Sequence, residues 1–444
     1  MFTRRISRRF VFAAALAMTA TTAGAETPSG PLTIDAAYQA ILASTMVTKT
    51  LADIKADDDA AFAEQKRITE IPAPPFKESA RAEFYLKRMR ELGFKDASID
   101  AEGNVVALRK GSGGGRPKLV VSAHLDTVFP EGTDVTVKES EGVTRAPGIG
   151  DDARGLAAML SLIKAMGENH VVTVGDILFV GTVGEEELGN LRGVKALFRD
   201  HTDIDGFISI DGLGITRVVN QATGSHRYEM TFKGPGGHSF REFGLPSAIH
   251  AMGRAIAKIA DLETPADPRT TFTVGTVSGG TSVNAIAAEA RMAVDMRSDS
   301  TEELLKLETR LLDLVKQAVV EENARWKTDK LTVGIKLIGD RPAGFVAMDS
   351  PIVQATQRAI GAISRGARVT FAGSSTDSNF AMSLGIPAVT LGGGGEGGNW
   401  HSRNEWYRPV DGYLGPQNAL LTILMLQGLD GATKPLLAVR QAAK

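Results

Sequence analysis

The chain has 444 residues, with 50 Lys or Arg against 52 Asp or Glu. This balance provides no basic excess for binding nucleic acid, and the sequence contains no arginine stripe with interleaved aromatic residues. It contains no cysteine, which excludes disulfides, thiolate metal sites and cysteine nucleophiles, so any metal ion must be held by His, Asp and Glu. The length exceeds what one ordinary hydrophobic core fills, and we expect two domains.

The first 25 residues have the pattern of an export signal. Four arginines between positions 4 and 9 precede the apolar run 10–18, and the small residues 23–25 offer a cleavage site. The run is too short to span a bilayer stably. Ser7-Arg8-Arg9-Phe10 is similar to a twin-arginine signal, with ordinary secretion as the alternative. We therefore expect a cleaved signal peptide over 1–25 and a periplasmic or secreted mature protein.

The next part of the chain predicts an α/β fold. Helical periodicity covers 36–71 and 78–92, ending at Pro72 and Gly93. Apolar strands then alternate with helical stretches, which predicts a mixed, largely parallel sheet between helices, with ligands at the carboxyl ends of the strands. The expected strands are 119–123, 177–183 and 207–210, and the expected helices between them are 155–166 and 191–198.

The pattern changes near residue 224 and returns to its earlier form after Pro342. The segment between predicts a smaller α+β unit inserted into the catalytic domain. Its expected strands are 226–232, 271–277, 287–296 and 331–338, and its helices are 245–262 and 301–322. The predicted organisation is a first catalytic part over 26–223, an inserted domain over 224–340 and a second catalytic part over 341–444, with elements at 380–384, 388–391 and 415–426.

Acidic or imidazole side chains follow successive apolar runs, where strands would end. Each has an ordinary structural interpretation: a lone His is more often structural, Asp151 suits a helix N-cap, and three consecutive Glu suit a solvated loop. Their repetition at strand ends instead indicates a metal site, since imidazole and carboxylate suit zinc, cobalt or manganese and a hydrolytic water. The residues are His124, Asp126, Asp151, Glu185, Glu186, Asp211 and His401.

Neighbouring acids suggest separate roles within this site. Asp126 lies two residues beyond His124 and points the same way along an extended chain, so its carboxylate can orient the imidazole. The adjacent Glu185 and Glu186 allow one carboxylate to bind metal while the other faces a bound water. Asp152 is interpreted as a helix cap or solvated charge, and Glu187 as solvated or in a local helix contact.

The motifs H-L-D-T-V, G-D-D-A-R-G, G-E-E-x-L-G, I-D-G, G-G-H-S and W-H-S-x-x-E resemble the co-catalytic zinc peptidase superfamily of peptidase T, carnosinase, carboxypeptidase G, acetylornithine deacetylase and aminoacylase. The resemblance covers essentially all of the mature chain. It implies two divalent ions, zinc with cobalt or manganese as alternatives. His124 and Asp211 would hold one ion, Glu186 and His401 the other, with Asp151 bridging them. Glu185 would be the general base for a water whose pKa the ions lower.

The resemblance also assigns roles to the inserted domain. His238 would stabilise the oxyanion, commonly across a dimer interface, with a turn histidine as the structural alternative. Asn284 resembles a substrate-binding position, and Arg297 is a candidate partner for a substrate carboxylate, although an Arg at a strand end is usually solvated. The implied partner is a second copy bound through this domain, while some relatives with longer insertions are monomers.

Two departures from the motifs limit this transfer. Ala153 stands where many relatives have Lys, and Glu187 makes the alignment of base and ligand ambiguous by one position; Leu188-Gly189 favours Glu185 as base. Asp211 resembles the peptidase T-like and carnosinase-like members, whereas deacylases often have Glu there.

We therefore expect a metallohydrolase that cleaves an amide in di- or tripeptides near a free amino terminus. The alternatives are a deacylase of N-acyl amino acids and a non-catalytic metal or ligand binder. A phosphate-binding loop at 392–398 is disfavoured because no Gly-Lys-Ser/Thr follows.

Overall fold

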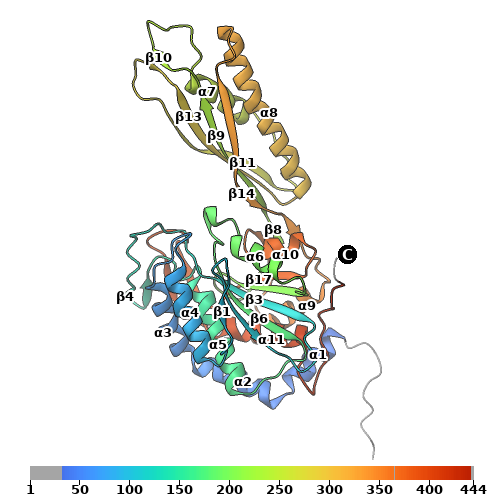
Figure 1. Cartoon of the computed structure of the whole chain (residues 1–444). Helices are drawn as coiled ribbons and strands as arrows, with labels where there is room; N and C mark the ends of the chain where they lie inside the picture. The colour runs from blue at the N-terminus through green and yellow to red at the C-terminus, as the bar shows by residue number, and fades with distance from the viewer. Residues whose placement is uncertain (1–32, 365, 442–444) are drawn as a thin grey trace, which may run out of the picture. The chain divides into compact units, whose positions relative to one another are not determined.

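A computed structural model describes residues 33–364 and 366–441 (Figure 1). The predicted signal peptide over 1–25 lies outside the described residues, so export stays a prediction. Within the described ranges, no helix is both long and apolar enough to cross a membrane.

The described chain begins with four helices: α1 (Ile34–Leu42), α2 (Thr45–Ala56), α3 (Asp58–Thr69) and α4 (Ser79–Glu91). The single helical stretch expected over 36–71 is therefore three helices. The side chain of Ser44 accepts a hydrogen bond from the amide of Val47 at 3.4 Å and caps α2, and Asp57 separates α2 from α3. A Ser that can cap its own downstream helix favours a new start over continuation.

A nine-stranded sheet forms the centre, in the order β1-β2-β6-β3-β7-β17-β8-β15, with β16 paired to β8. Four neighbours are parallel: β6 (Asp176–Thr182), β3 (Lys118–His124), β7 (Gly206–Ile210) and β17 (Ala388–Leu391). Every residue of β6, β7 and β17 is buried, so both faces of the sheet are covered. The predicted fold class is confirmed. The remaining strands are β1 (Ser98–Ile99), β2 (Val105–Arg109), β8 (Arg217–Ala222), β15 (Gly344–Phe345) and β16 (Thr370–Ser374).

Besides α1 to α4, five further helices pack with this sheet into one hydrophobic core. They are α5 (Ala153–Glu168), α6 (Arg192–Asp200), α9 (Pro351–Ile363), α10 (Ser378–Ser383) and α11 (Leu414–Gln427). Helix α11 is buried at all of its positions after the first, as expected for a helix without a polar face.

A second, antiparallel sheet has the order β11-β13-β9-β14 and a core of its own with two helices. Burial alternates along β13, so one face packs on the helices. Each expected strand and helix of this unit is present, while the domain boundaries stay a prediction. The bounds are β9 (Gly224–Lys233), β11 (Thr270–Gly279), β13 (Glu289–Ser298), β14 (Thr332–Arg341), α7 (Ala248–Ala260) and α8 (Thr301–Trp326). We call this sheet the inserted sheet.

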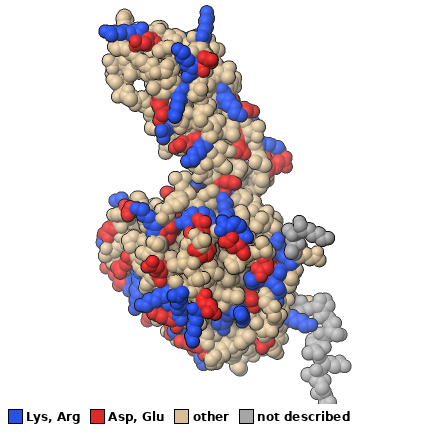
Figure 2. Space-filling view, viewed as in Figure 1, with Lys and Arg blue, Asp and Glu red and all other residues tan. Residues whose placement is uncertain are grey.

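Short elements complete the fold. A two-stranded sheet joins β10 (Gly237–His238) to β12 (Ala285–Ile286), and a four-stranded one contains β4 (Lys138–Ser140), β5 (Val143–Arg145), β18 (Glu396–Gly398) and β19 (Trp406–Arg408). A short 3₁₀ helix, η1 (Glu187–Gly189), follows β6. Basic and acidic side chains are interspersed over the face shown in Figure 2.

Candidate metal centre and active site

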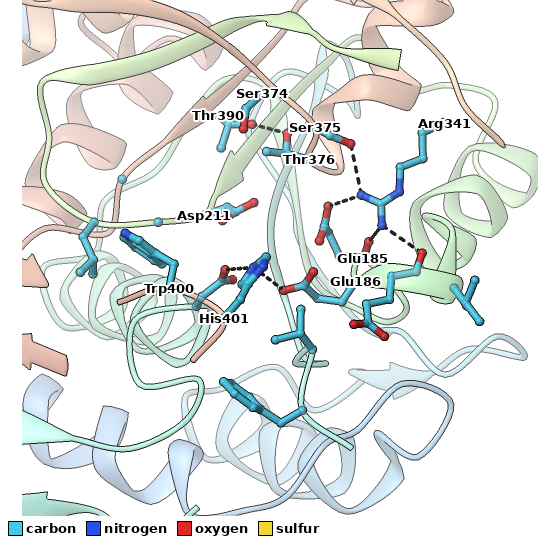
Figure 3. Close-up of a pocket in the computed structure, with 18 of the residues that line it drawn as sticks. Glu185, Glu186, Asp211, Arg341, Ser374, Ser375, Thr376, Thr390, Trp400 and His401 are labelled. Atoms are coloured by element: carbon cyan, nitrogen blue, oxygen red, sulfur yellow. Dashed lines mark hydrogen bonds and ion pairs between the residues drawn. The ribbon is translucent and has the colours of Figure 1, made fainter. Parts of the chain in front are cut away.

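The carboxyl ends of the parallel strands meet at one edge of the central sheet. His124 ends β3, Glu185 and Glu186 follow β6, and Asp211 follows β7. Because parallel neighbours all end at the same edge, these side chains converge although they lie far apart in the sequence. Glu185, Glu186 and Asp211 border a cavity of about 1110 Å³ that His401 also lines (Figure 3).

Asp151 lies between two imidazoles. Its Oδ1 is 2.9 Å from Nε2 of His124, and its Oδ2 is 3.2 Å from Nε2 of His401. The same nitrogen of His401 is 3.4 Å from Oε1 of Glu186. One carboxylate thus faces one histidine with each oxygen, which is the arrangement required of a ligand shared by two metal ions.

Asp152 and Asp211 form the other side of this cluster with His124. Asp152 is fully buried, and its oxygens accept hydrogen bonds from the amides of His124 and Gly155, each at 3.0 Å. It therefore caps α5, one of the two interpretations expected for it. Because both oxygens of Asp152 are used by amides, Asp151 and Asp211 are the better ligand candidates of this part of the cluster.

The cluster carries more negative charge than its surroundings compensate. Burial, reinforced by Asp151, raises the pKa of Glu186 to about 8, and the same two causes raise the pKa of Asp211 well above its usual range. Hydrogen bonds to Asp151 and Glu186 raise the pKa of His401 to about 10. Carboxylates crowded in this way bind a cation favourably, because the cation removes their mutual repulsion.

The donor set fits divalent metal ions. Ligand atoms of His124, Asp151 and Glu186 lie within 4.8 Å of one another, and so do those of His124, Asp152 and Asp211. Imidazole and carboxylate donors suit zinc, cobalt and manganese. Carboxylates thus lie on both sides of His124, and Asp151, with one oxygen toward His124 and the other toward His401, is the residue that two neighbouring ions could share.

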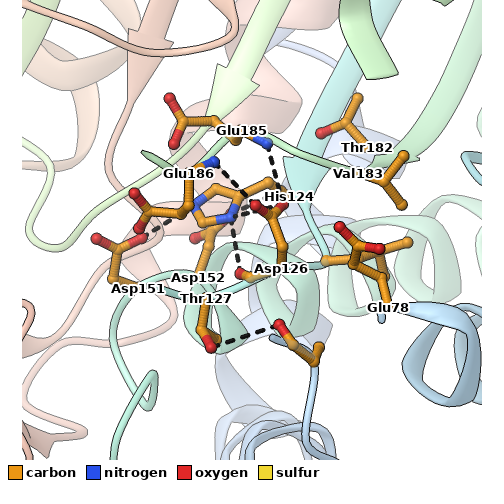
Figure 4. A network of polar contacts seen from close by, with 12 residues as sticks. Glu78, His124, Asp126, Thr127, Asp151, Asp152, Thr182, Val183, Glu185 and Glu186 are labelled. Carbon is orange, nitrogen blue, oxygen red and sulfur yellow. Dashed lines mark hydrogen bonds and ion pairs between the residues drawn. The ribbon is translucent and has the colours of Figure 1, made fainter. Parts of the chain in front are cut away.

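Asp126 organises the site differently from the sequence prediction. The backbone carbonyl of Asp126, 3.0 Å from Nδ1 of His124, makes the contact with the imidazole, whereas its carboxylate is 3.7 Å away. That carboxylate accepts the amides of Glu185 at 3.1 Å and Glu186 at 2.8 Å (Figure 4). The buried carboxylate of Asp126 therefore fixes the turn that carries both glutamates.

The glutamates that follow β6 have different surroundings. Glu186 faces His401, whereas Glu185 faces Arg341, whose Nη1 is 3.2 Å from its Oε1 (Figure 3). Burial raises the pKa of Glu185 while Arg341 opposes the rise. Glu187 begins η1 and is exposed, in agreement with the local role expected for it.

Sequence reasoning missed two residues that support the site. Glu405 is buried and accepts three amides: Oε1 takes Gly150 at 2.7 Å and Asp151 at 3.0 Å, and Oε2 takes Gly148 at 3.0 Å. The W-H-S-x-x-E motif contained Glu405 but gave no indication of its partners. For Arg341, the sequence offers no indication of a role in the site other than its position next to the end of the inserted segment.

The three residues expected from the inserted domain are not brought together. Arg297 lines the cavity, and its Nε binds Asp295 at 2.7 Å. His238 and Asn284 are adjacent to each other, since the amide of Ser239 donates to the carbonyl of Asn284 at 3.0 Å. Both are exposed, and neither is among the residues that line this cavity.

Comparison with known proteins identifies the family. Residues 120–424 match the model for "Peptidase family M20/M25/M40". The chain belongs to this family. The predicted resemblance is thereby confirmed, and the chain is a metallohydrolase of the M20 family.

Three similar proteins illustrate the range of the M20 relatives. The uncharacterized protein YqjE of Bacillus subtilis is 29% identical over 325 residues, covering 71% of this chain and 83% of that protein. The structure of a tripeptidase from Staphylococcus aureus is 24% identical with a TM-score of 0.68, covering 82% of this chain and 97% of the other. A dinuclear metal binding M20 peptidase from Bacillus subtilis is 15% identical with a TM-score of 0.61, covering 84% and 99%.

Proposed function

We propose that this M20 hydrolase is an exported dipeptidase or tripeptidase that acts near a free amino terminus. One observation carries the catalytic part of the proposal: Asp151 directs one oxygen toward His124 and the other toward His401, beside Glu185. Export rests on the arginine-rich, apolar pattern of residues 1–25, and a periplasmic or secreted location follows from it.

His124 and Asp211 would hold one divalent ion, Glu186 and His401 the other, and Asp151 both. Bound there, the ions would act as Lewis acids and lower the pKa of a water molecule toward neutrality. Zinc is the ion we expect, with cobalt and manganese as alternatives.

Glu185 would act as general base and then general acid. Its carboxylate takes the proton of the attacking water and delivers it to the nitrogen of the leaving amine. Arg341 pairs with Oε1 of Glu185, which leaves Oε2 as the oxygen that exchanges the proton.

The lining of the cavity suits the carboxylate of a small substrate. Arg297 and Arg217 both line the cavity, and the side chain of Arg297 is 43% exposed although its Nε binds Asp295. A peptide of two or three residues with a free carboxyl end matches such a site. His238 and Asn284 would enter this cavity from a second copy of the chain, in line with the family resemblance.

A deacylase of N-acyl amino acids is the second candidate, because such substrates also end in a free carboxylate. The Asp at position 211 favours the peptidase, while the arginines serve either substrate. The amino-terminal half of the substrate therefore distinguishes the two functions.

A substrate panel tests the proposal. The purified protein is depleted of metal, replenished with zinc, cobalt or manganese, and assayed on di- and tripeptides with free or acetylated amino termini and on N-acyl amino acids. We expect metal-dependent hydrolysis of the free peptides and loss of turnover by orders of magnitude in Glu185→Gln. Preference for acetylated substrates would assign the deacylase function, and full activity after exhaustive chelation would exclude the metal mechanism.

A further inference from the structure

The loop that carries Glu185 is held by the strand that leaves the inserted sheet. Arg341 is the last residue of β14, and its Nη2 donates to the carbonyl oxygens of Glu185 and Glu187. One residue earlier, the amide of Asp340 donates to Oδ1 of Asn190 at 2.7 Å. The segment from Glu185 to Asn190 is therefore bound at both ends by consecutive residues of one strand.

Arg341 contacts both the side chain and the backbone of the same glutamate. Its Nη1 binds Oε1 of Glu185 at 3.2 Å and Oγ of Ser375 at 3.2 Å (Figure 3), and its side chain is only 5% exposed. A planar guanidinium that holds the carbonyl and the carboxylate of one residue restricts the χ angles between them. Such contacts determine where the carboxylate points, whereas a purely structural clamp would require only the carbonyls.

We propose that Arg341 is the positioning residue of Glu185: it occupies Oε1, so that Oε2 is presented to the cavity in one orientation. The inference rests on the proposed function, in which Glu185 moves the proton. It adds that the group that orients the base comes from the same chain, from the last residue of β14, the strand that leads out of the inserted sheet.

The contact predicts a defect in turnover rather than in substrate binding. An ångström of displacement of a catalytic group lowers the rate by up to about a hundredfold. Arg341→Ala should therefore lower kcat roughly 10- to 100-fold, leave KM within about threefold, and retain the wild-type metal content, because Arg341 contacts none of the proposed ligands. Arg341→Lys keeps a cation that reaches only one of the groups that Arg341 contacts. Its kcat should therefore lie between those of the wild type and of Arg341→Ala.

Chemical rescue separates positioning from a structural role. Arg341 lines the cavity, so guanidinium at millimolar concentration should restore part of kcat in Arg341→Ala. Lys195→Met is the matched control, because Nζ of Lys195 binds the carbonyl of Asp340 at 2.6 Å without contacting Glu185. This control should keep the wild-type kcat and show no response to guanidinium.

Two results in Arg341→Ala alone would overturn the inference: a wild-type kcat, or a defect confined to KM or to metal content. A third would be a loss of kcat that guanidinium does not rescue, combined with an equally low kcat in Arg341→Lys. Should Arg341→Ala fail to fold, the kcat of Arg341→Lys decides the question: a reduced kcat supports the inference, and an unchanged kcat overturns it. An active Glu185→Gln enzyme would refute the base assignment itself and the inference with it, and this result is distinguishable because it does not involve Arg341.

Discussion

Replacing Glu405 by Gln should weaken metal binding without unfolding the protein. The carboxylate of Glu405 accepts three amides in the 148–151 loop. Gln offers one acceptor oxygen, so in its best orientation it serves Gly150 and Asp151 and turns its NH₂ group toward the amide of Gly148. The unpaired buried N–H then costs about 1–3 kcal/mol.

A second effect offsets this cost in the metal-free protein. Burial, followed by repulsion from Asp151, raises the pKa of Glu405 from 4.5 to about 7. A carboxyl whose folded pKa is raised lowers stability as pH rises from the unfolded to the folded pKa, here by about 3 kcal/mol at pH 8. Gln carries no such penalty, so the free energy of unfolding of the metal-free variant should stay within roughly 2 kcal/mol of the wild type.

Metal affinity has no such compensation. The amide of Gly148 loses its partner, so the 148–151 loop that places Asp151 between His124 and His401 is held less firmly. Loss of an outer partner of a metal site typically lowers affinity 10- to 100-fold. Competition with a chromophoric chelator at pH 8 measures the affinity, and urea unfolding measures the stability. Glu396→Gln, at an exposed glutamate in the same segment, is the control. Affinity within twofold of the wild type in Glu405→Gln would refute the reasoning.

Three further predictions concern other residues. Asp126→Ala should release the amides of the two glutamates and lower kcat 10- to 100-fold, and steady-state kinetics showing less than a twofold change would contradict this role. Arg297→Gln should raise KM about tenfold for peptides with a free carboxyl end, but a similar increase for C-terminally amidated peptides would argue against carboxylate binding. Hydrogen bonding to Asp340, with burial opposing it, raises the pKa of His226, which also lies 3.2 Å from Glu308. The resulting stabilisation is complete below a pH of about 6.5 and is lost as the pH rises through the folded pKa. His226→Asn should therefore lower the urea midpoint more at acidic than at alkaline pH. An equal decrease of the midpoint at both pH values would exclude this linkage.

The strand-end residues could be predicted because their positions follow from topology alone. A run such as ILFVGTV is buried on both sheet faces, and its carboxyl end lies at the edge where parallel neighbours also end. The strand topology therefore brings together His124, Glu186 and Asp211, independently of the conformation of the loops that follow. The position of His401 does not follow from the first catalytic part alone. It depends on the pairing of β17 with β7, a contact between segments on either side of the inserted domain.

The contacts of Asp126 could not be predicted in the same way. The period of an extended chain places its side chain on the same side as that of His124, but the strand ends at His124. Beyond that residue the backbone turns so that the carbonyl faces the imidazole and the carboxylate faces the next loop. Arg341 and Glu405 escaped prediction for a related reason. Their partners lie on loops distant in the sequence, and those of Glu405 are all backbone amides, so neither set leaves a periodic pattern.

The point of insertion explains why Arg341, rather than a residue within the inserted domain, reaches Glu185. The chain leaves the central sheet after Ala222 and re-enters it at Gly344, and these two residues are paired between β8 and β15. An insertion whose ends are already neighbours adds little loop-closure cost. It also places both of its end strands, β9 and β14, near the loop that follows β6: Arg227 from β9 donates to the carbonyl of Glu187 at 2.8 Å, and Arg341 from β14 reaches the carboxylate. Residues at the ends of the insertion therefore contact the loop that carries Glu185 in the same chain, whereas His238 on β10 and Asn284, just before β12, do not line the cavity.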